Sequence, residues 1–184
     1  MIFPWHLGRD IRMLALDVDG VLTDGVIHLD AEGHEHKRFH VTDGLGIRLL
    51  LEAGLRVGLI TARRSVAVAK RAEELSLSFA HMGVRGGKWQ CLQGELLKGG
   101  IRPDQCACMG DDLIDLEMLC RVGLATAPMD ARPEVKQRVH WVASLPGGRG
   151  AVRELAEGLL MAQGRWEDIV AGFIPGSHSN DHGQ

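Results

Sequence analysis

The sequence has no long apolar run and no concentrated block of basic residues. No stretch approaches the ~18 consecutive apolar residues that a membrane-spanning helix needs. Residues 1–10 lack the basic-then-apolar form of a signal peptide, so we expect a cytoplasmic protein. Lysine and arginine together number 21 against 24 acidic residues, giving a net charge of −3. Binding to a phosphate backbone needs clustered positive charge, so nucleic acid is not the expected partner, and a small molecule is.

Cysteine is also scarce. The four cysteines are Cys91, Cys106, Cys108 and Cys120, and they do not show paired metal-ligand spacing with histidines. Cys106 and Cys108 fall on one face of an expected buried strand. Free cysteine packs as a small hydrophobe, so we expect the cysteines to be core residues.

The length and composition are those of one globular domain. The chain has 184 residues, of which 45% are apolar and 24% are charged. We assign residues 1–171 to this domain. Residues 172–184 are polar and rich in glycine, serine and histidine, and we expect them to form a flexible tail.

Short apolar runs that end in Asp, Thr or Gly alternate with helical patterns along the chain. Such alternation is typical of an α/β fold in which a parallel sheet lies between two layers of helices. The expected strands cover residues 14–16, 57–60, 78–81, 106–109, 123–125 and 140–142. The expected helices cover residues 44–53, 65–75, 88–99, 113–121, 132–137 and 150–163.

Residues 26–40, between the first expected strand and the first expected helix, have a different pattern. Two partly alternating segments flank an Asp-Ala-Glu-Gly turn, which predicts a projecting β-hairpin. An isolated two-stranded hairpin is marginal in water, and Val26, Ile27, Leu29 and Phe39 give this one apolar surface to bury. We therefore expect the hairpin to pack against another subunit.

Two carboxylates, Asp17 and Asp19, follow the first expected strand. In an open α/β sheet, ligands bind at the carboxyl ends of the strands, so acids at this position suggest a site. The alternative is a turn in which Asp-x-Asp-Gly caps its own backbone. The chain then supplies Thr61 and Asp111, each just after an apolar run, and Lys88 between them. Their order and strand-end positions favour a site.

These residue types fit the transfer of a phosphoryl group. The carboxylate of Asp17 can attack phosphorus to form an aspartyl phosphate, and Asp19 can act as the general acid and base. Because a phosphate dianion and Asp17 repel each other, the site requires a hard cation such as Mg²⁺. We expect Asp17, the main-chain carbonyl of Asp19 and Asp111 to hold it.

The remaining candidates each have a structural alternative. Thr61 offers a hydroxyl to a phosphoryl oxygen, or it caps the following helix. Lys88 supplies a positive charge to the phosphoryl oxygens and the aspartate, or it is a solvated surface lysine. Asp112 and Asp115 are either functional or helix-start acids favoured by the macrodipole, and the sequence leaves this open.

Together these residues resemble the haloacid dehalogenase superfamily of phosphotransferases, over nearly all of residues 12–163. A narrower resemblance is to the family of 3-deoxy-D-manno-octulosonate 8-phosphate phosphatases. The segments that carry it are DVDGVLTDG at 17–25, FHVTDGLGI at 39–47, GDDLID at 110–115 and GGRGAVRE at 147–154.

The resemblance implies a Rossmann-like three-layer domain of the haloacid dehalogenase type without a cap domain. It also implies a cytoplasmic, Mg²⁺-dependent phosphatase that acts on an eight-carbon acidic sugar phosphate during lipopolysaccharide precursor synthesis. Family members are homotetramers, in which the hairpins form a central barrel and a neighbouring subunit shapes the active site. No membrane or nucleic-acid partner is implied.

The spacing also leaves no room for a cap domain. Only 23 residues, 20–42, separate Asp19 from Asp43, and the hairpin uses most of them. Residues 83–87 are too few to form a second domain. Exclusion of water from the site would therefore have to come from another subunit.

Two departures from the family pattern concern the substrate. Family members commonly have Arg at the position of Thr42 and Gly at the position of Ala62. Arg63 and Arg149, and with them Arg64, remain candidates for binding the sugar carboxylate, because arginine recognises carboxylate in a bidentate manner. Arg149 has the alternative of only satisfying its glycine-rich loop.

Two other functions are compatible with part of this pattern. One is a phosphatase for a nine-carbon ulosonate 9-phosphate, which shares the same capless core. The other is a non-catalytic oligomerisation module of the kind attached to sugar-nucleotide synthetases. The intact acids and lysine, and the lack of a synthetase domain, argue against the second function.

Overall fold

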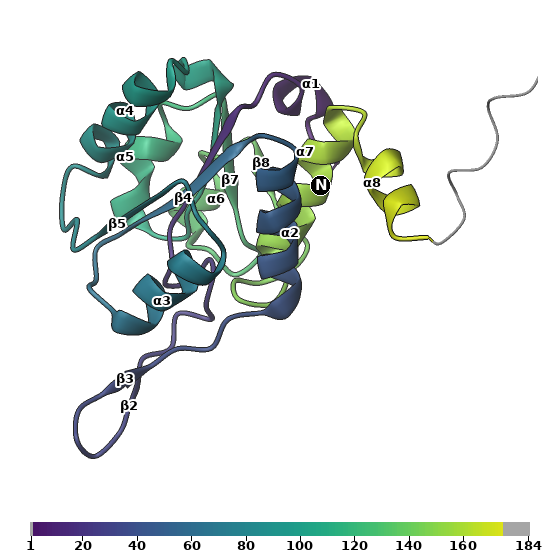
Figure 1. Cartoon of the computed structure of the whole chain (residues 1–184). Coiled ribbons are helices and arrows are strands. Elements are labelled where there is room, and N and C mark those ends of the chain that lie inside the picture. The colour runs from purple at the N-terminus through teal and green to yellow at the C-terminus, as the bar shows by residue number, and fades with distance from the viewer. Residues whose placement is uncertain (1, 175–184) are drawn as a thin grey trace, which may run out of the picture.

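A six-stranded parallel sheet forms the centre of the computed structural model, which describes residues 2–174 (Figure 1). The strand order is β5-β4-β1-β6-β7-β8, and every neighbouring pair is parallel. The bounds are β1 Met13–Leu16, β4 Arg56–Thr61, β5 Phe79–Met82, β6 Cys106–Met109, β7 Leu124–Ala127 and β8 Trp141–Val142. All six expected strands are confirmed, with ends that shift by at most two residues.

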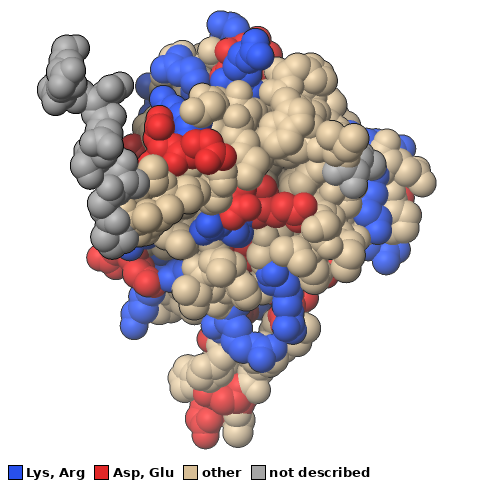
Figure 2. Space-filling view, turned by 90° about the vertical axis from the view of Figure 1, so that its right-hand side faces the viewer, with Lys and Arg blue, Asp and Glu red and all other residues tan. Residues whose placement is uncertain are grey.

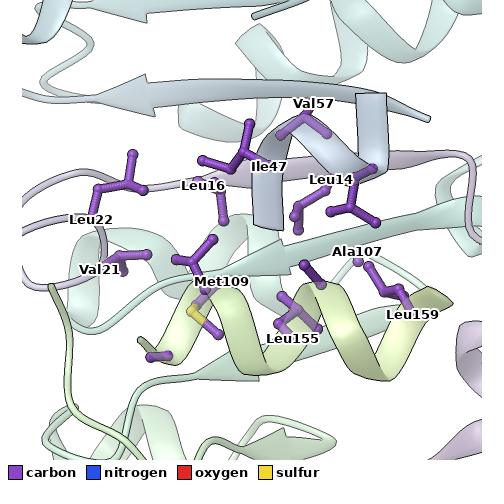
Figure 3. Packing of buried hydrophobic residues seen from close by; sticks show 14 of the residues in the cluster. Leu14, Leu16, Val21, Leu22, Ile47, Val57, Ala107, Met109, Leu155 and Leu159 are labelled. Carbon is purple, nitrogen blue, oxygen red and sulfur yellow. The ribbon is translucent and has the colours of Figure 1, made fainter. Parts of the chain in front are cut away.

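Helices cover both faces of the sheet. Successive side chains of β1 point to opposite faces, so each face has its own apolar cluster. Leu14 and Leu16 pack with Ile47 of α2 and Leu155 and Leu159 of α7, as Figure 3 shows. This face holds α1 Trp5–Gly8, α2 Val41–Glu52, α3 Val66–Glu74, α7 Ala151–Ala162 and α8 Trp166–Gly172.

The second face is built in the same way. Met13 and Ala15 pack with Leu92 of α4 and Met118 of α5. The helices here are α4 Lys88–Gly99, α5 Leu116–Leu119 and α6 Pro133–Lys136. The predicted three-layer α/β/α architecture is therefore confirmed. None of the helices in residues 2–174 is long and apolar enough to cross a membrane.

Some local expectations were wrong. The helix expected at 113–121 is a 3-10 turn, η2 Leu113–Asp115, followed by the short α5. Neither α1 nor α8 was expected, and a further 3-10 turn, η1 Pro103–Gln105, precedes β6. Because α8 extends through Gly172, the predicted tail begins inside a helix, and residues 175–184 lie outside the described residues.

The cysteines divide into core and surface positions. Cys106 and Cys108 are fully buried on the second face of the sheet, as expected. Cys91 is only partly buried, and Cys120 at the end of α5 is exposed. The expectation of a core position was wrong for Cys120, because α5 ends at the buried Leu119 and Cys120 follows it as the exposed C-cap.

The start of α2 is fixed by a contact with α7. The helix begins at Val41 rather than near Gly44, which places Asp43 in its first turn. The buried Asp43 carboxylate accepts hydrogen bonds from the backbone N–H groups of Gly150 (3.2 Å) and Arg153 (2.8 Å) at the start of α7. This contact satisfies two otherwise unpaired donors of α7 and joins the two helices.

The predicted hairpin projects from one end of the sheet (Figure 1). Its strands are β2 His28–Leu29 and β3 Glu35–His36, which pair antiparallel. Figure 2 shows it as a narrow extension with acidic side chains near the tip and basic ones toward its base. Val26, Ile27 and Leu29 remain 51%, 49% and 63% exposed, whereas Phe39 packs against the main core. No cap domain is inserted anywhere in residues 2–174.

Candidate active site

Three residues of the predicted site lie at the carboxyl ends of three adjacent strands. Asp17 follows β1 directly, Thr61 is the last residue of β4, and Asp111 follows β6 after one glycine. The strand β1 lies between β4 and β6, and the backbone N–H of Asp17 donates to the carbonyl of Met109 on β6 at 3.0 Å. The three residues therefore lie at one edge of the sheet.

Lys88 is a buried residue that pairs with two carboxylates. It begins α4, and its Nζ donates to Asp17 Oδ1 and to Asp115 Oδ1, both at 2.7 Å. Only 2% of Lys88 is exposed, so it is not a solvated surface lysine. Burial lowers the pKa of Lys88, but the charges of Asp17 and Asp115 outweigh that effect and raise it. The raised pKa favours the charged form of Lys88 beside Asp17.

Asp115, whose role the sequence left open, is fully buried and contacts both Lys88 and the loop that carries Asp111. Its Oδ1 binds Lys88, and its Oδ2 accepts from the backbone N–H groups of Asp111 (3.1 Å) and Asp112 (3.3 Å). Asp112 instead uses its own Oδ1 to accept from Leu113 N–H at 2.7 Å, which caps η2. Asp112 is thus a helix-start acid that caps η2, whereas the Asp115 carboxylate contacts both Lys88 and the loop that carries Asp111.

The acids at this edge fit a hard divalent cation. Carboxylate oxygens of Asp17, Asp111 and Asp115 lie within 4.8 Å of one another. Burial, followed by the charge of Asp115, raises the pKa of Asp17 to about 7 against the opposing effect of Lys88. Burial, followed by the charges of Asp17 and Asp115, raises the pKa of Asp111 to about 8. The buried Asp17 and Asp115 share Lys88, and the half-buried Asp111 has no such partner in the described part of the chain, so an oxygen-seeking cation such as Mg²⁺ suits the remaining oxygens of Asp17 and Asp111.

The loop that follows Asp19 is shaped by close backbone packing. Gly20 has φ = 89°, and a Cβ there would overlap the carboxylate of Asp111. A Cβ at Gly147 would in turn overlap the carbonyl oxygen of Gly20. The Asp111 carboxylate therefore lies against the backbone of Gly20, directly after Asp19. The main-chain carbonyl of Asp19 is the third metal ligand that the sequence predicts.

Asp19 contacts the hairpin. Lys37 Nζ donates to Asp19 Oδ1 and lies 3.2 Å from Glu35 Oε1. Arg63 donates to Glu35 Oε2, and its Nε lies 3.9 Å from Asp19 Oδ2. We call Asp19, Lys37, Glu35 and Arg63 the hairpin ion-pair ring. Sequence reasoning missed Lys37 and Glu35, although their spacing of two residues in an extended segment signals a shared face.

Thr61 and the arginines occupy different parts of the rim. Thr61 is buried, and its Oγ1 accepts from Arg63 N–H at 3.3 Å; the N-cap of α3 is Ser65, so Thr61 does not cap that helix. Arg63 lines a cavity of about 590 Å³ together with Arg64 and Arg85. Arg149 is exposed and lines a separate cavity of about 170 Å³. The two candidates for the substrate carboxylate therefore do not share a cavity.

The volume of a cavity does not indicate where the candidate active site lies. A larger cavity of about 690 Å³ lies at the opposite, amino ends of the strands, where Arg12, Leu55 and Gln105 precede β1, β4 and β6. The perturbed acids gather at the carboxyl ends instead. Chemistry and position in the sheet thus identify the candidate active site.

Comparisons with known proteins agree with this geometry. Residues 87–150 match the family model described as haloacid dehalogenase-like hydrolase. The 3-deoxy-D-manno-octulosonate 8-phosphate phosphatase of Escherichia coli strain K12 is 42% identical over 160 residues, which cover 87% of this chain and 85% of that protein.

Solved structures of similar proteins have the same fold. The phosphatase of that name from Moraxella catarrhalis, in complex with magnesium ion, phosphate ion and a KDO molecule, is 35% identical with a TM-score of 0.90. The alignment covers 92% of this chain and 97% of that one. The cobalt-bound phosphatase from Haemophilus influenzae is 37% identical with a TM-score of 0.84, over 91% of this chain and 98% of that one.

The extent of these matches identifies the family. The similarity to the Escherichia coli protein spans most of both chains, and the family model covers Lys88, Asp111 and Asp115 of the site. The chain belongs to the family of 3-deoxy-D-manno-octulosonate 8-phosphate phosphatases.

Proposed function

We propose that this chain is a Mg²⁺-dependent phosphatase that hydrolyses 3-deoxy-D-manno-octulosonate 8-phosphate to the free sugar acid and phosphate. The observation that carries the proposal is the buried pairing of Asp17 with Lys88, beside Asp111, at the carboxyl ends of β1 and β6. Relatives that are similar over most of the chain bear the name of this activity. The product is a sugar acid used in lipopolysaccharide precursor synthesis.

The first half of the reaction transfers the phosphoryl group to the protein. A carboxylate oxygen of Asp17 attacks phosphorus, and the bond between phosphorus and the sugar oxygen breaks. Asp19 gives its proton to that departing oxygen. Lys88 balances the charge of Asp17 and of the phosphoryl oxygens, and the hydroxyl of Thr61 donates to one of those oxygens. Bound Mg²⁺ would neutralise the negative charge that Asp17, Asp111 and the phosphate bring together.

The second half returns the protein to its starting state. Asp19, now a carboxylate, takes a proton from a water molecule, whose oxygen attacks phosphorus as the bond to Asp17 breaks. Phosphate leaves, and Asp19 again holds the proton it needs for the next cycle. The same residue thus serves as acid and then as base.

Recognition of the sugar acid falls to the rim of the site. Arg63 and Arg149 flank the loops that carry Asp19 and the glycine-rich segment, and both can donate two hydrogen bonds to a carboxylate. Since no cap covers the site, a neighbouring subunit completes it. The exposed side chains of Val26, Ile27 and Leu29 support assembly of several copies through their hairpins. The proposed assembly is a homotetramer in the cytoplasm.

A phosphate-release assay with a panel of substrates tests the proposed function. The panel contains 3-deoxy-D-manno-octulosonate 8-phosphate, a nine-carbon ulosonate 9-phosphate and neutral sugar phosphates, each with Mg²⁺ and with a chelator. We expect the highest kcat/KM for the eight-carbon acid and no turnover with the chelator. A preference for the nine-carbon acid would identify the related activity, and no turnover of any ester would contradict a phosphatase.

A further inference from the structure

Lys37 is a hairpin residue whose side chain ends inside the candidate active site. It lies next to β3 of the projecting hairpin, yet only 1% of its side chain is exposed. Burying an ammonium group is costly unless it is paired. Here Asp19 and Glu35 both contact it, so the cost is offset by two carboxylates.

The two oxygens of Asp19 differ in their environment. Oδ1 accepts the hydrogen bond from Lys37. Oδ2 lies 3.9 Å from Arg63 Nε, beyond hydrogen-bond distance, and no hydrogen bond to Oδ2 occurs within residues 2–174. Oδ2 is therefore the oxygen that can exchange a proton with a substrate oxygen or a water molecule.

Glu35 keeps Lys37 in place and balances its charge. It contacts Lys37 and accepts a hydrogen bond from Arg63, which holds the pKa of Glu35 below its usual range. Glu35 therefore offsets the positive charge of Lys37 whether or not Asp19 holds a proton. Because of this pairing, Lys37 can fix the orientation of Asp19 without adding net charge to the site.

We propose that Lys37 is a positioning residue for Asp19: it holds Oδ1 so that Oδ2 faces the departing sugar oxygen and then the attacking water. Lys37 itself takes no part in the proton transfer. The proton moves from Asp19 Oδ2 to the sugar oxygen as the phosphorus–oxygen bond breaks, and returns to Oδ2 from water in the second half. The inference rests on the proposed function, because it assigns Lys37 a part in that reaction.

A double-mutant cycle tests this inference. Lys37→Met and Lys37→Arg are made in the natural protein and in the Asp19→Asn variant, and phosphate release from the eight-carbon acid phosphate is measured. We expect Lys37→Met to lower kcat by roughly ten- to a hundredfold and to change KM little. This loss is smaller than the roughly 10²–10⁴-fold that general acid–base catalysis contributes, because Asp19 itself remains. Lys37→Arg should recover much of the loss, and in the Asp19→Asn background Lys37→Met should cost nothing further.

The matched control is Lys98→Met, which removes an exposed lysine that also pairs with a glutamate, Glu95, on α4. It should leave kcat unchanged. Circular dichroism and light scattering establish that each variant folds and assembles. If Lys37→Met does not fold, Lys37→Gln and Lys37→Arg supply the same cycle.

A second measurement separates positioning from a general structural role. Single-turnover phosphoryl transfer from p-nitrophenyl phosphate needs little protonation of the leaving group, so Lys37→Met should slow it much less than transfer from the sugar phosphate. Equal losses for both leaving groups, equal losses in both backgrounds, or a loss confined to KM would overturn the inference. An inactive natural protein would instead refute the proposed function, and an active one unaffected by Lys37→Met would refute only the role of Lys37.

Discussion

Gly20 is the residue whose size most directly controls the metal site. A Cβ there would overlap the carboxylate of Asp111, and its φ of 89° is a conformation that alanine adopts at a cost of roughly 1–2 kcal/mol. We predict that Gly20→Ala displaces Asp111 and raises the Mg²⁺ concentration for half-maximal activity by at least about tenfold, as loss of one charge-assisted contact suggests. Titration of activity with Mg²⁺ measures this.

Gly54→Ala is the matched control for that substitution. Gly54 has a φ of 85°, but within residues 2–174 no atom beyond Gly54 and its two chain neighbours lies within 4 Å of where its Cβ would be. It carries the same backbone strain without the overlap, so it should lower thermal stability and leave the Mg²⁺ requirement unchanged. If the two variants need the same Mg²⁺ concentration, Gly20 does not position Asp111.

Arg149 tests how the acidic group of the substrate is recognised. The residue is exposed and lines a small cavity with Arg38 and His40, next to the loop packed on Gly20. We predict that Arg149→Ala raises KM for the eight-carbon acid phosphate by about ten- to a hundredfold, corresponding to roughly 1.5–3 kcal/mol for one charge-assisted bond. KM for a neutral phosphate ester should barely change. Equal effects on both esters would show that Arg149 only supports its loop.

At the scale of elements, the hairpin exposes apolar side chains and has no core of its own. Ile27 and Leu29 are 49% and 63% exposed on a two-stranded element that is marginal by itself. We predict that the double substitution Ile27→Asp with Leu29→Asp converts the proposed homotetramer into smaller species and reduces activity. Multi-angle light scattering at micromolar concentration measures the assembly.

The control for this element is Leu97→Asp, because Leu97 is 77% exposed on α4, a helix that lies away from the hairpin (Figure 1). It should leave the tetramer intact. A natural protein that is monomeric at micromolar concentration would contradict the proposed assembly. Dissociation by Leu97→Asp alone would place the interface on α4 instead.

For the whole molecule, the clustered acids link Mg²⁺ binding to pH. The pKa values of Asp17 and Asp111, about 7 and about 8, are raised above the ordinary value of 3.8. Each group therefore contributes stability to the metal-free protein at acid pH, and this stability is lost as the pH rises through 7 and 8. Mg²⁺ needs the ionised carboxylates, so its apparent affinity rises over the same range.

We predict that the increase in Tm caused by a fixed Mg²⁺ concentration is larger at pH 8.5 than at pH 6. Thermal unfolding followed by circular dichroism, with and without Mg²⁺, measures it. The Asp111→Asn variant should lose most of the Mg²⁺ effect at both pH values. An equal or larger effect of Mg²⁺ at pH 6 in the natural protein would contradict the link.

Much of the fold and part of the site could be predicted from the sequence because their signals are local. The strand β1 is a continuous apolar run, and acids directly after it must lie at the strand end. The positions of Asp17, Thr61 and Asp111 at one edge follow from that logic and from the parallel order of the strands.

The rest depends on contacts between distant residues. The pairing of Lys88 with Asp115 crosses 27 positions, and that of Asp19 with Lys37 crosses 18, so neither has a repeating pattern along the chain. The exposure of Cys120 likewise depends on where a short helix ends. Three-dimensional packing, rather than periodicity, sets these features.

The most direct test of the account is phosphate release from 3-deoxy-D-manno-octulosonate 8-phosphate by the natural protein and by Asp17→Asn, both with Mg²⁺. An amide cannot act as the attacking carboxylate, so the account predicts turnover by the natural protein and none above background by the folded variant. Asp104→Asn, which changes an exposed aspartate outside the site, should match the natural protein. Substantial turnover by folded Asp17→Asn would contradict the aspartyl-phosphate mechanism.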